Sequence, residues 1–287
     1  MAVRLSGILN VGSRMSVLGR VRSLHVYPVK SARGIALETA TLDDFGLADD
    51  RRFMLCQSSD GRFLSQRELP ALALVQPSLV GDHLIIAAPG RESLHVLRRP
   101  SGPRRPVQLW DWDAEASVVD LGADAAKWWS ALVQRDVRFV WSPDDTTRLT
   151  QPTATGVAGG RVAFSDGFPL LLVSEASLDG LNARLPAPVP MDRFRPNVVL
   201  SEVATAHAED GWARVRVGDV VLRGTKRCPR CVMTTIDQAT ATGRDEPLRT
   251  LATYRRDDGK IWFGVNAEHE THGTLRVGDA VREMGSA

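Results

Sequence analysis

Short apolar segments recur along the whole chain, many of them alternating between hydrophobic and polar residues, and turns rich in Gly, Asp and Pro separate them. A period of two residues is typical of a β-strand with one buried face, and short apolar runs bounded by turns are typical of buried strands. Clear examples are residues 21–27, 84–88, 170–173, 198–200 and 261–265. The pattern therefore predicts a protein built mainly of β-strands.

Three segments have helical features instead. Residues 124–135 begin with Asp124, which can cap a helix, and residues 174–185 carry leucines at helical spacing. Residues 247–255 begin with a proline, which is favourable in the first turn of a helix. Many short strands with few helices indicate an α+β fold in which a β-barrel dominates.

Composition and charge exclude several classes of protein. The chain has 287 residues, of which 43% are hydrophobic, so it can form one or two domains with a large core. A net charge of +2 does not favour a nucleic-acid-binding protein. Three cysteines argue against a disulfide scaffold and for a reducing compartment. No apolar run approaches the roughly 18 residues of a transmembrane helix.

The N-terminus is basic, because residues 1–37 contain no acidic residue. This pattern resembles a transit peptide, but residues 21–29 already have the alternation of a strand. We therefore expect a cytoplasmic protein in which residues 1–18 are loosely ordered. Residues 1–14 could be dispensable, with Met15 as the true start.

Two of the three cysteines, Cys228 and Cys231, lie close together in the segment 223–256. Several basic residues lie near both cysteines in the sequence. Positive charge near a thiol favours the thiolate, which is the nucleophilic and metal-binding form. The apolar run 232–236 that follows predicts a strand. The pattern indicates a site for a soft metal ion with an anionic partner. The neighbouring basic residues are Arg223, Lys226, Arg227 and Arg230.

Other interpretations of the two cysteines remain open. A CxxC motif is also typical of dithiol redox proteins, although there it normally opens a helix. The pair could form half of a zinc site completed by His269 and His272, or it could be purely structural. Residues three apart on an extended strand point to opposite faces, so a single cysteine ligand is the natural expectation.

Several longer motifs resemble one known family. KRCPRCVMTTIDQATATGRDEPLRTLATYRR and FGVNAEHETHGTLRVGDAV resemble the C-terminal MOSC domain of molybdenum-cofactor proteins, the family of the mitochondrial amidoxime-reducing components and bacterial hydroxylaminopurine-detoxifying reductases. SLHVYPVKSARGI and DDRRFMLCQSSDGRFLSQRELPAL resemble its N-terminal domain. The resemblance covers about residues 20–284. It implies a β-rich N-terminal domain, residues 19–140, packed on a MOSC β-barrel, residues 141–287.

The resemblance also implies a cofactor site between the two domains. The cofactor would be a molybdenum–molybdopterin, with Cys231 as the protein ligand of the metal and Cys228 either structural or in the immediate surroundings of that ligand. Asp166 would lie near the metal and the substrate, as a catalytic residue that orients the substrate or relays a proton. Guanidinium and ammonium groups suit the phosphate of such a cofactor. The cofactor-contacting residues implied are Lys30, Ser31, Arg52, Asp166, Gly167, Arg195, Pro229, Arg230, Cys231 and Asn266.

The implied reaction is the two-electron reduction of N-hydroxylated compounds such as amidoximes and hydroxylaminopurines. A ferredoxin-type cluster needs four cysteines and the chain has three, so we expect a separate electron donor of the ferredoxin, flavodoxin or reductase type. We further expect a monomer that binds neither nucleic acid nor membrane. Two alternatives remain: a sulfur-transfer protein that carries a persulfide on Cys231, and a non-catalytic carrier of the cofactor.

Overall fold

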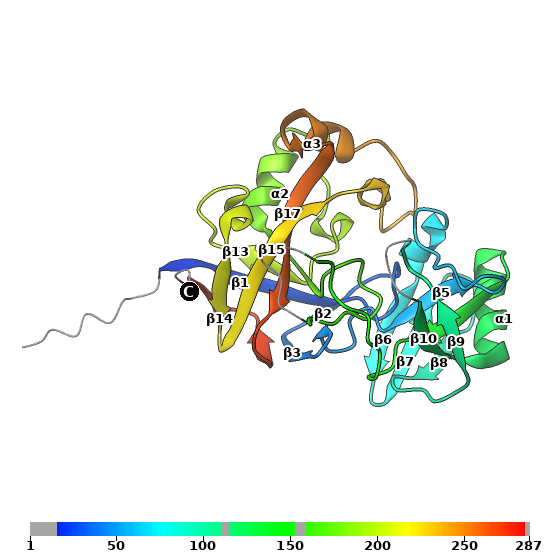
Figure 1. Ribbon diagram of the computed structural model, residues 1–287. Coiled ribbons are helices and arrows are strands. Elements are labelled where there is room, and N and C mark those ends of the chain that lie inside the picture. The colour runs from blue at the N-terminus through cyan, green and yellow to red at the C-terminus, as the bar shows by residue number, and fades with distance from the viewer. Residues whose placement is uncertain (1–15, 111–114, 153–158, 285–287) are drawn as a thin grey trace, which may run out of the picture.

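A closed β-barrel forms one half of the molecule. The computed structural model of the chain describes residues 16–110, 115–152 and 159–284 (Figure 1). Seven strands pair in the order β12-β13-β1-β19-β14-β15-β17, and β17 pairs back onto β12 to close the circle. All neighbours are antiparallel except β12 and β13. The strands are β1 (Val17–Val26), β12 (Leu170–Ser174), β13 (Val198–Ser201), β14 (Arg214–Val217), β15 (Val220–Pro229), β17 (Lys260–His269) and β19 (Ala280–Glu283).

Alternating side chains fill the barrel interior. In β1, for example, Val21, Leu24 and Val26 are buried, and they join a core to which all seven strands contribute. The parallel pair β12–β13 needs a crossover connection, which begins with the helix α2 (Glu175–Asn182). The apolar side of each strand thus faces the barrel interior, although β1 has a bulge between Val21 and Ser23.

A second unit, built around a four-stranded sheet, lies beside the barrel at the lower right of Figure 1. The sheet order is β5-β11-β10-β9, and α1 (Gly122–Val133) packs on it through the buried Trp129. The ring of Trp129 lies 5.2 Å from that of Phe139, which stacks on Phe53 at 5.4 Å. The strands are β5 (Phe53–Gln57), β9 (Arg104–Val107), β10 (Ala116–Asp120) and β11 (Val137–Trp141).

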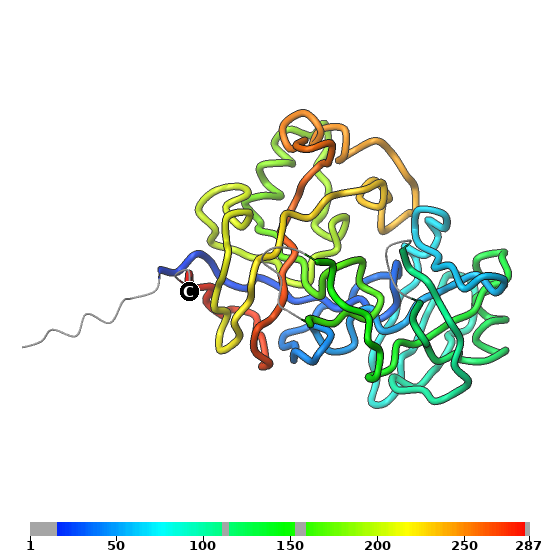
Figure 2. The backbone as a smooth tube through the Cα atoms, viewed as in Figure 1, coloured from blue at the N-terminus to red at the C-terminus, as the bar shows by residue number. Residues whose placement is uncertain are grey.

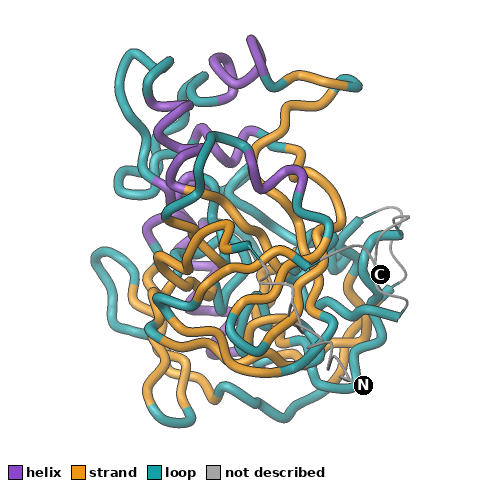
Figure 3. The backbone as a smooth tube through the Cα atoms, turned by 90° about the vertical axis from the view of Figure 1, so that its left-hand side faces the viewer, coloured by secondary structure: helices purple, strands orange, loops and turns teal. Residues whose placement is uncertain are grey.

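Small sheets and short helices complete the fold, and strands occupy the centre of the molecule (Figure 3). One small sheet has the order β6-β7-β8, another β18-β3-β4. The other strands are β2 (Ile35–Leu37), β3 (Thr39–Asp43), β4 (Gly46–Leu47), β6 (Gln76–Val80), β7 (His83–Ala87), β8 (Leu94–Leu97), β16 (Arg256–Asp257) and β18 (Gly273–Arg276). The other helices are α3 (Leu248–Tyr254) and the 3₁₀ turns η1 (Pro70–Leu74), η2 (Met191–Arg193), η3 (Ala208–Gly211) and η4 (Val232–Thr235). No helix in the described ranges is long and apolar enough to cross a membrane.

The predicted β-dominated α+β fold is confirmed, and the three predicted helices are present with shifted ends. Ser174 caps α2, since its Oγ accepts a hydrogen bond from the Ser177 amide at 3.1 Å. Asp124 does not cap α1; the carboxylate of Asp120 instead accepts from the Gly122 amide at 2.9 Å. The helix therefore begins two residues earlier than predicted.

The predicted strand at residues 232–236 is wrong, because this run forms the 3₁₀ turn η4. The hydroxyl groups of Thr234 and Thr235 donate to the carbonyl groups of Cys231 and Val232, three residues earlier, at 3.0 and 2.7 Å. Such local side-chain bonds compete with a strand ladder. Cys231 consequently sits at a turn where β15 has already ended.

The first strand of the chain belongs to the barrel. Figure 2 shows the start of the described chain running beside its end, where β1 pairs with β19. β1 also pairs with β13, so residues 17–26 complete the barrel that we placed within residues 141–287. The chain then leaves the barrel, builds the second unit and returns to the barrel at β12.

Candidate functional site

A pocket lies where the two units meet, and segments far apart in the sequence line it. The segment after β1 contributes Lys30 and Ser31, and the segment before β12 contributes residues 165–168. The end of β15 and the start of η4 contribute both cysteines. Ten site residues were predicted, and nine line this pocket: Lys30, Ser31, Asp166, Gly167, Arg195, Pro229, Arg230, Cys231 and Asn266.

The pocket is strongly positive. Asp166 is the only acidic residue among the described residues that line it. Such an excess of cations in a confined site favours an anionic ligand. The six basic residues in the lining are Lys30, Arg51, Arg67, Arg193, Arg195 and Arg230.

Lys30 is held at the pocket floor with only 8% of its surface exposed. Its ammonium group donates to the carbonyl of Phe164 at 2.8 Å and pairs closely with Asp166. Burial lowers the pKa of Lys30, while Asp166 opposes that shift. The next residue, Ser31, has a positive φ of 70°. Its buried hydroxyl has no hydrogen-bond partner within the described part of the chain, so it is available to a ligand.

Asp166 is an ionised carboxylate in this pocket. Burial would raise its pKa, but the neighbouring Lys30, followed by Arg67 and Arg51, lowers the pKa to about 2. Its side chain is 57% exposed and faces the pocket opening. Asp166 can therefore accept hydrogen bonds near neutral pH, but it does not carry a proton to donate.

Arg195 and Arg51 form a second group of cations on the wall of the pocket. Both guanidinium groups lie over the ring of Tyr27, at 4.2 and 4.5 Å from its centroid. Burial lowers the pKa of Arg195 to about 10. Arg51 donates to the Asn197 side chain at 2.9 Å and to Asp50 at 2.5 Å. The aromatic ring and the short polar contacts fix the positions of both arginines.

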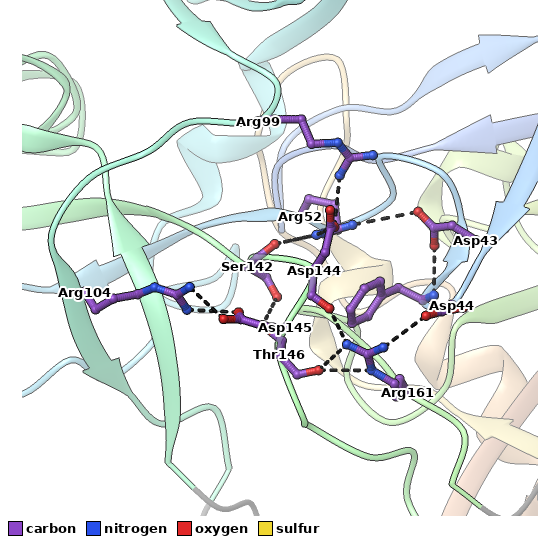
Figure 4. Close-up of polar contacts among 11 residues, drawn as sticks. Asp43, Asp44, Arg52, Arg99, Arg104, Ser142, Asp144, Asp145, Thr146 and Arg161 are labelled. Atoms are coloured by element: carbon purple, nitrogen blue, oxygen red, sulfur yellow. Dashed lines mark hydrogen bonds and ion pairs between the residues drawn. The ribbon is translucent and has the colours of Figure 1, made fainter.

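Arg52 is the exception among the predicted residues, because it does not line the pocket. It is 1% exposed and points away, where it donates to the carbonyl of Ser142 at 3.0 Å and to Asp144 at 2.7 Å (Figure 4). Its guanidinium group also lies 4.5 Å from the centre of the Phe45 ring. Arg51, the preceding residue, lines the pocket in its place. The prediction for Arg52 is therefore corrected by one position.

The two cysteines both line the pocket, but they sit in different local structures. Cys228 is the penultimate residue of β15, and Cys231 precedes η4 in an extended conformation. The two cysteines do not lie on one continuous strand, because β15 ends at Pro229. The expectation that strand alternation points their side chains to opposite faces therefore does not apply. The Arg230 guanidinium lies 3.0 Å from the Cys228 sulfur, and that of Arg67 lies 3.5 Å from the Cys231 sulfur.

Three further predicted residues complete the lining near the cysteines. Arg230 is anchored by a 2.8 Å hydrogen bond from its guanidinium to the carbonyl of Phe194. Asn266 lies on β17 opposite Leu171 of β12. A side chain on Gly167 would meet Gln151 at 3.2 Å, so a glycine keeps this side of the pocket open. Gln151 belongs to the long connection after β11, which therefore borders the site.

A zinc site shared by the cysteines and histidines is not formed. His269 and His272 lie in a different pocket, stacked on each other at 5.5 Å and next to Asp44. No group of three or more His, Cys, Asp or Glu in the described segments is arranged to hold a metal ion.

Trp110 packs edge-on against Phe63 at 5.1 Å, whereas Trp112 lies outside the described residues.

Sequence reasoning missed six polar residues of the described pocket lining: Arg51, Ser65, Arg67, Ser165, Arg193 and Asn197. Arg193 connects the pocket to the segment after Cys231, since it donates to the Asp237 carboxylate at 2.9 Å. Arg67 lies within a motif that carried the family resemblance, but nothing in the motif itself marks this arginine as a pocket residue. Only the assembled fold brings these side chains together.

Comparison with known proteins gives two matching families and several similar proteins, of which two are described. The MOSC domain family matches residues 159–282, and the MOSC N-terminal beta barrel domain family matches residues 18–136. The chain is 33% identical to mitochondrial amidoxime reducing component 2 of Rattus norvegicus, over 94% of this chain and 85% of that protein. It is 35% identical to mitochondrial amidoxime-reducing component 1 of Mus musculus, over 95% of this chain and 84% of that protein.

Solved structures provide only a remote likeness. The YUAD protein from Bacillus subtilis matches 92% of this chain and 93% of its own, with 10% identity and a TM-score of 0.42.

Proposed function

The chain belongs to the family of MOSC-domain proteins that includes the mitochondrial amidoxime-reducing components, and we propose that it is a molybdenum-cofactor-dependent enzyme that reduces N-hydroxylated compounds. The observation that carries the proposal is the pocket between the two units. There, a cysteine with a neighbouring guanidinium group faces the same space as five other basic side chains. Curated relatives named for amidoxime reduction support the choice of reaction.

The residues present fit an anionic pterin cofactor with a phosphate group. Six basic side chains face one acid, so the pocket has a large surplus of positive charge. Several buried donors also have no hydrogen-bond partner within the described segments: the Ser31 hydroxyl and the Nε atoms of Arg193 and Arg230. Buried polar groups in native proteins are nearly always paired, so these donors are suited to a bound ligand.

Different residues would hold different parts of the cofactor. Lys30, Ser31, Arg51 and Arg195 are suited to its phosphate and pterin, because they offer ammonium, hydroxyl and guanidinium donors. Cys231 would bind the metal through its sulfur, since thiolate is a good ligand for a soft metal centre. When bound, the cofactor would supply the two-electron reduction at its metal.

The protein's own contribution is to position the substrate and to supply charge. Asp166, as a carboxylate at the pocket opening, can accept an N–H from the substrate and hold its N–O bond toward Cys231. Its low pKa supports the orienting role over that of a proton donor near neutral pH. Lys30 lies beside it and is the closest side chain with protons to donate.

The overall reaction consumes two electrons and two protons. The N–O bond of an amidoxime breaks, an N–H bond forms, and the oxygen leaves as water. We infer a separate donor protein as the source of electrons, because the three cysteines cannot hold a four-cysteine iron–sulfur cluster.

The test is metal and cofactor analysis of the purified protein followed by turnover. We expect about one molybdenum per chain, a fluorescent pterin after oxidation, and conversion of benzamidoxime to benzamidine with a chemical reductant. A sulfur carrier would instead release thiocyanate on treatment with cyanide and contain no molybdenum. A loaded protein that converts no N-hydroxylated compound would be a cofactor carrier, and either result would contradict the proposal.

A further inference from the structure

Arg67 is placed between the two groups that define the reactive end of the pocket. Its Nη2 atom lies 3.5 Å from the sulfur of Cys231 and 3.9 Å from Oδ2 of Asp166. Its guanidinium group lies 5.2 Å from the centre of the Trp110 ring. The side chain is 25% exposed, so it is part of the pocket wall and still reaches solvent.

The loop that carries Arg67 is held firmly. The amide and hydroxyl groups of Ser65 both donate to the carboxylate of Glu68, at 3.0 and 2.9 Å. Between them, the fully buried Gln66 donates to the carbonyl of Ser31 at 2.6 Å and forms two amide hydrogen bonds with Gln238. Arg67 is therefore fixed relative to both halves of the pocket.

Arg67 and Lys30 together occupy the two oxygens of Asp166. Lys30 pairs with Oδ1, and Arg67 faces Oδ2. Asp166 is the only acid among the described pocket residues, so it is the only carboxylate there that a cationic ligand could bind. The guanidinium group of Arg67 would compete with a cationic ligand for Oδ2.

The charge of the ligand changes during the proposed reaction. An amidoxime is neutral near pH 7, whereas the amidine product is protonated and carries a positive charge. An amidinium group has two parallel N–H donors, like a guanidinium group, and would bind an available carboxylate through both. Without Arg67, Asp166 would hold the product beside the metal ligand.

We propose that Arg67 is the residue that selects ligands by charge and releases the product. Its guanidinium group covers Oδ2 of Asp166 and repels amidinium, so neutral N-hydroxylated substrates enter and the cationic product leaves. This inference rests on the proposed reductase function, but it can be measured without turnover.

The experiment compares binding of benzamidine with that of benzamide, its neutral isostere, by calorimetry on the molybdenum-loaded protein. Wild-type protein should bind benzamide at least as tightly as benzamidine. In Arg67→Gln, benzamidine should bind about tenfold tighter than in the wild-type protein, because one nearby positive charge at intermediate screening is removed. The affinity for benzamide should change by less than about threefold. The same gain should appear as product inhibition of benzamidoxime reduction.

Two further variants make the test specific. Arg67→Lys keeps the charge and should retain weak benzamidine binding. Arg67→Gln combined with Asp166→Asn should lose the gain, because the carboxylate is absent. Tighter binding of benzamidine than of benzamide to the wild-type protein would overturn the inference even if the variants failed to load. An equal gain for both ligands, or a gain that persists without Asp166, would also overturn it. A wild-type protein that reduces no amidoxime would refute the reductase function. The role of Arg67 in charge selection would still be decided by the binding measurements alone.

Discussion

Arg51 and Arg52 are adjacent in the chain, yet their guanidinium groups lie on opposite sides of it. Arg51 lines the pocket between the two units and donates to Asn197 at 2.9 Å. Arg52 is buried on the other side, where it donates to the carbonyl of Ser142 at 3.0 Å. The backbone of Arg51 has a φ of 48°, an unusual conformation for a residue with a side chain. Of the two arginines, Arg51 is the one that lines the pocket.

The first prediction follows from this division. Arg51→Lys keeps a charge next to Asp50 but loses the planar group that also reaches Asn197. Cofactor binding should weaken by about 1.5–3 kcal/mol, the range of a charge-assisted hydrogen bond, with little change in the melting temperature of the cofactor-free protein.

Arg52→Lys is the matched control, because it makes the same substitution one residue away. Lysine cannot reproduce the paired contacts with Ser142 and Asp144. The free energy of unfolding should fall by about 2–4 kcal/mol, while the folded fraction still binds cofactor. Thermal unfolding and molybdenum content of both variants distinguish the two roles; equal molybdenum loss in both would contradict the assignment.

The second prediction concerns Lys30 and Arg195, two of the three buried cations among the described pocket residues. Lys30→Ala and Arg195→Ala should each weaken cofactor binding by about 1.5–3 kcal/mol, because each removes a charge-assisted bond. The loss of molybdenum and pterin should exceed what the melting temperature of the cofactor-free variant explains. Variants with wild-type cofactor content would show that these side chains are ordinary structural charges.

The third prediction is a pH dependence of stability from Asp166. The pKa of Asp166 is about 2 in the folded protein, compared with 3.8 for an ordinary aspartate. The folded state therefore favours the carboxylate. The resulting stabilisation is fully present above about pH 4 and is lost as the pH falls toward 2. Because the side chain is more than half exposed, solvent screening limits the effect to about 1 kcal/mol or less.

Urea unfolding of wild-type protein and Asp166→Asn between pH 2 and 6 measures this contribution. The stability difference between the two proteins should shrink as the pH decreases through this range. A difference that grows toward low pH would mean that Asp166 is protonated in the folded protein and could act as an acid.

Much of the fold could be predicted because its signals are local. Alternation marks strands such as β1, and Ser174 marks the start of α2. Strand pairing is not local, and for that reason the position of β1 between β13 and β19 of the barrel was missed. The apolar run after Cys231 was misassigned because threonine hydroxyl groups, which the apolar pattern ignores, stabilise a turn there.

The candidate site divides in the same way. Residues within contiguous motifs, such as Lys30 with Ser31 and the segment around Cys231, could be predicted from resemblance and do line one pocket. Arg67 and Arg193 reach the pocket from loops whose positions depend on the packing of the two units. Which of Arg51 and Arg52 lines the pocket depends on the local path of the backbone, which the residue types alone do not reveal.

The central claim is that the sulfur of Cys231 binds molybdenum in this pocket, and paired cysteine variants test it most directly. Molybdenum per chain and benzamidine formation are measured for Cys231→Ser and Cys228→Ser, both purified under reducing conditions. Cys231→Ser should lose benzamidoxime reduction, because a hydroxyl group is a poor substitute for a thiolate on molybdenum. Cys228→Ser should keep substantial activity and lose about 1 kcal/mol of stability, since its sulfur packs partly among apolar side chains. An inactive Cys228→Ser with an active Cys231→Ser would reverse the ligand assignment, and full activity of both variants would contradict the account.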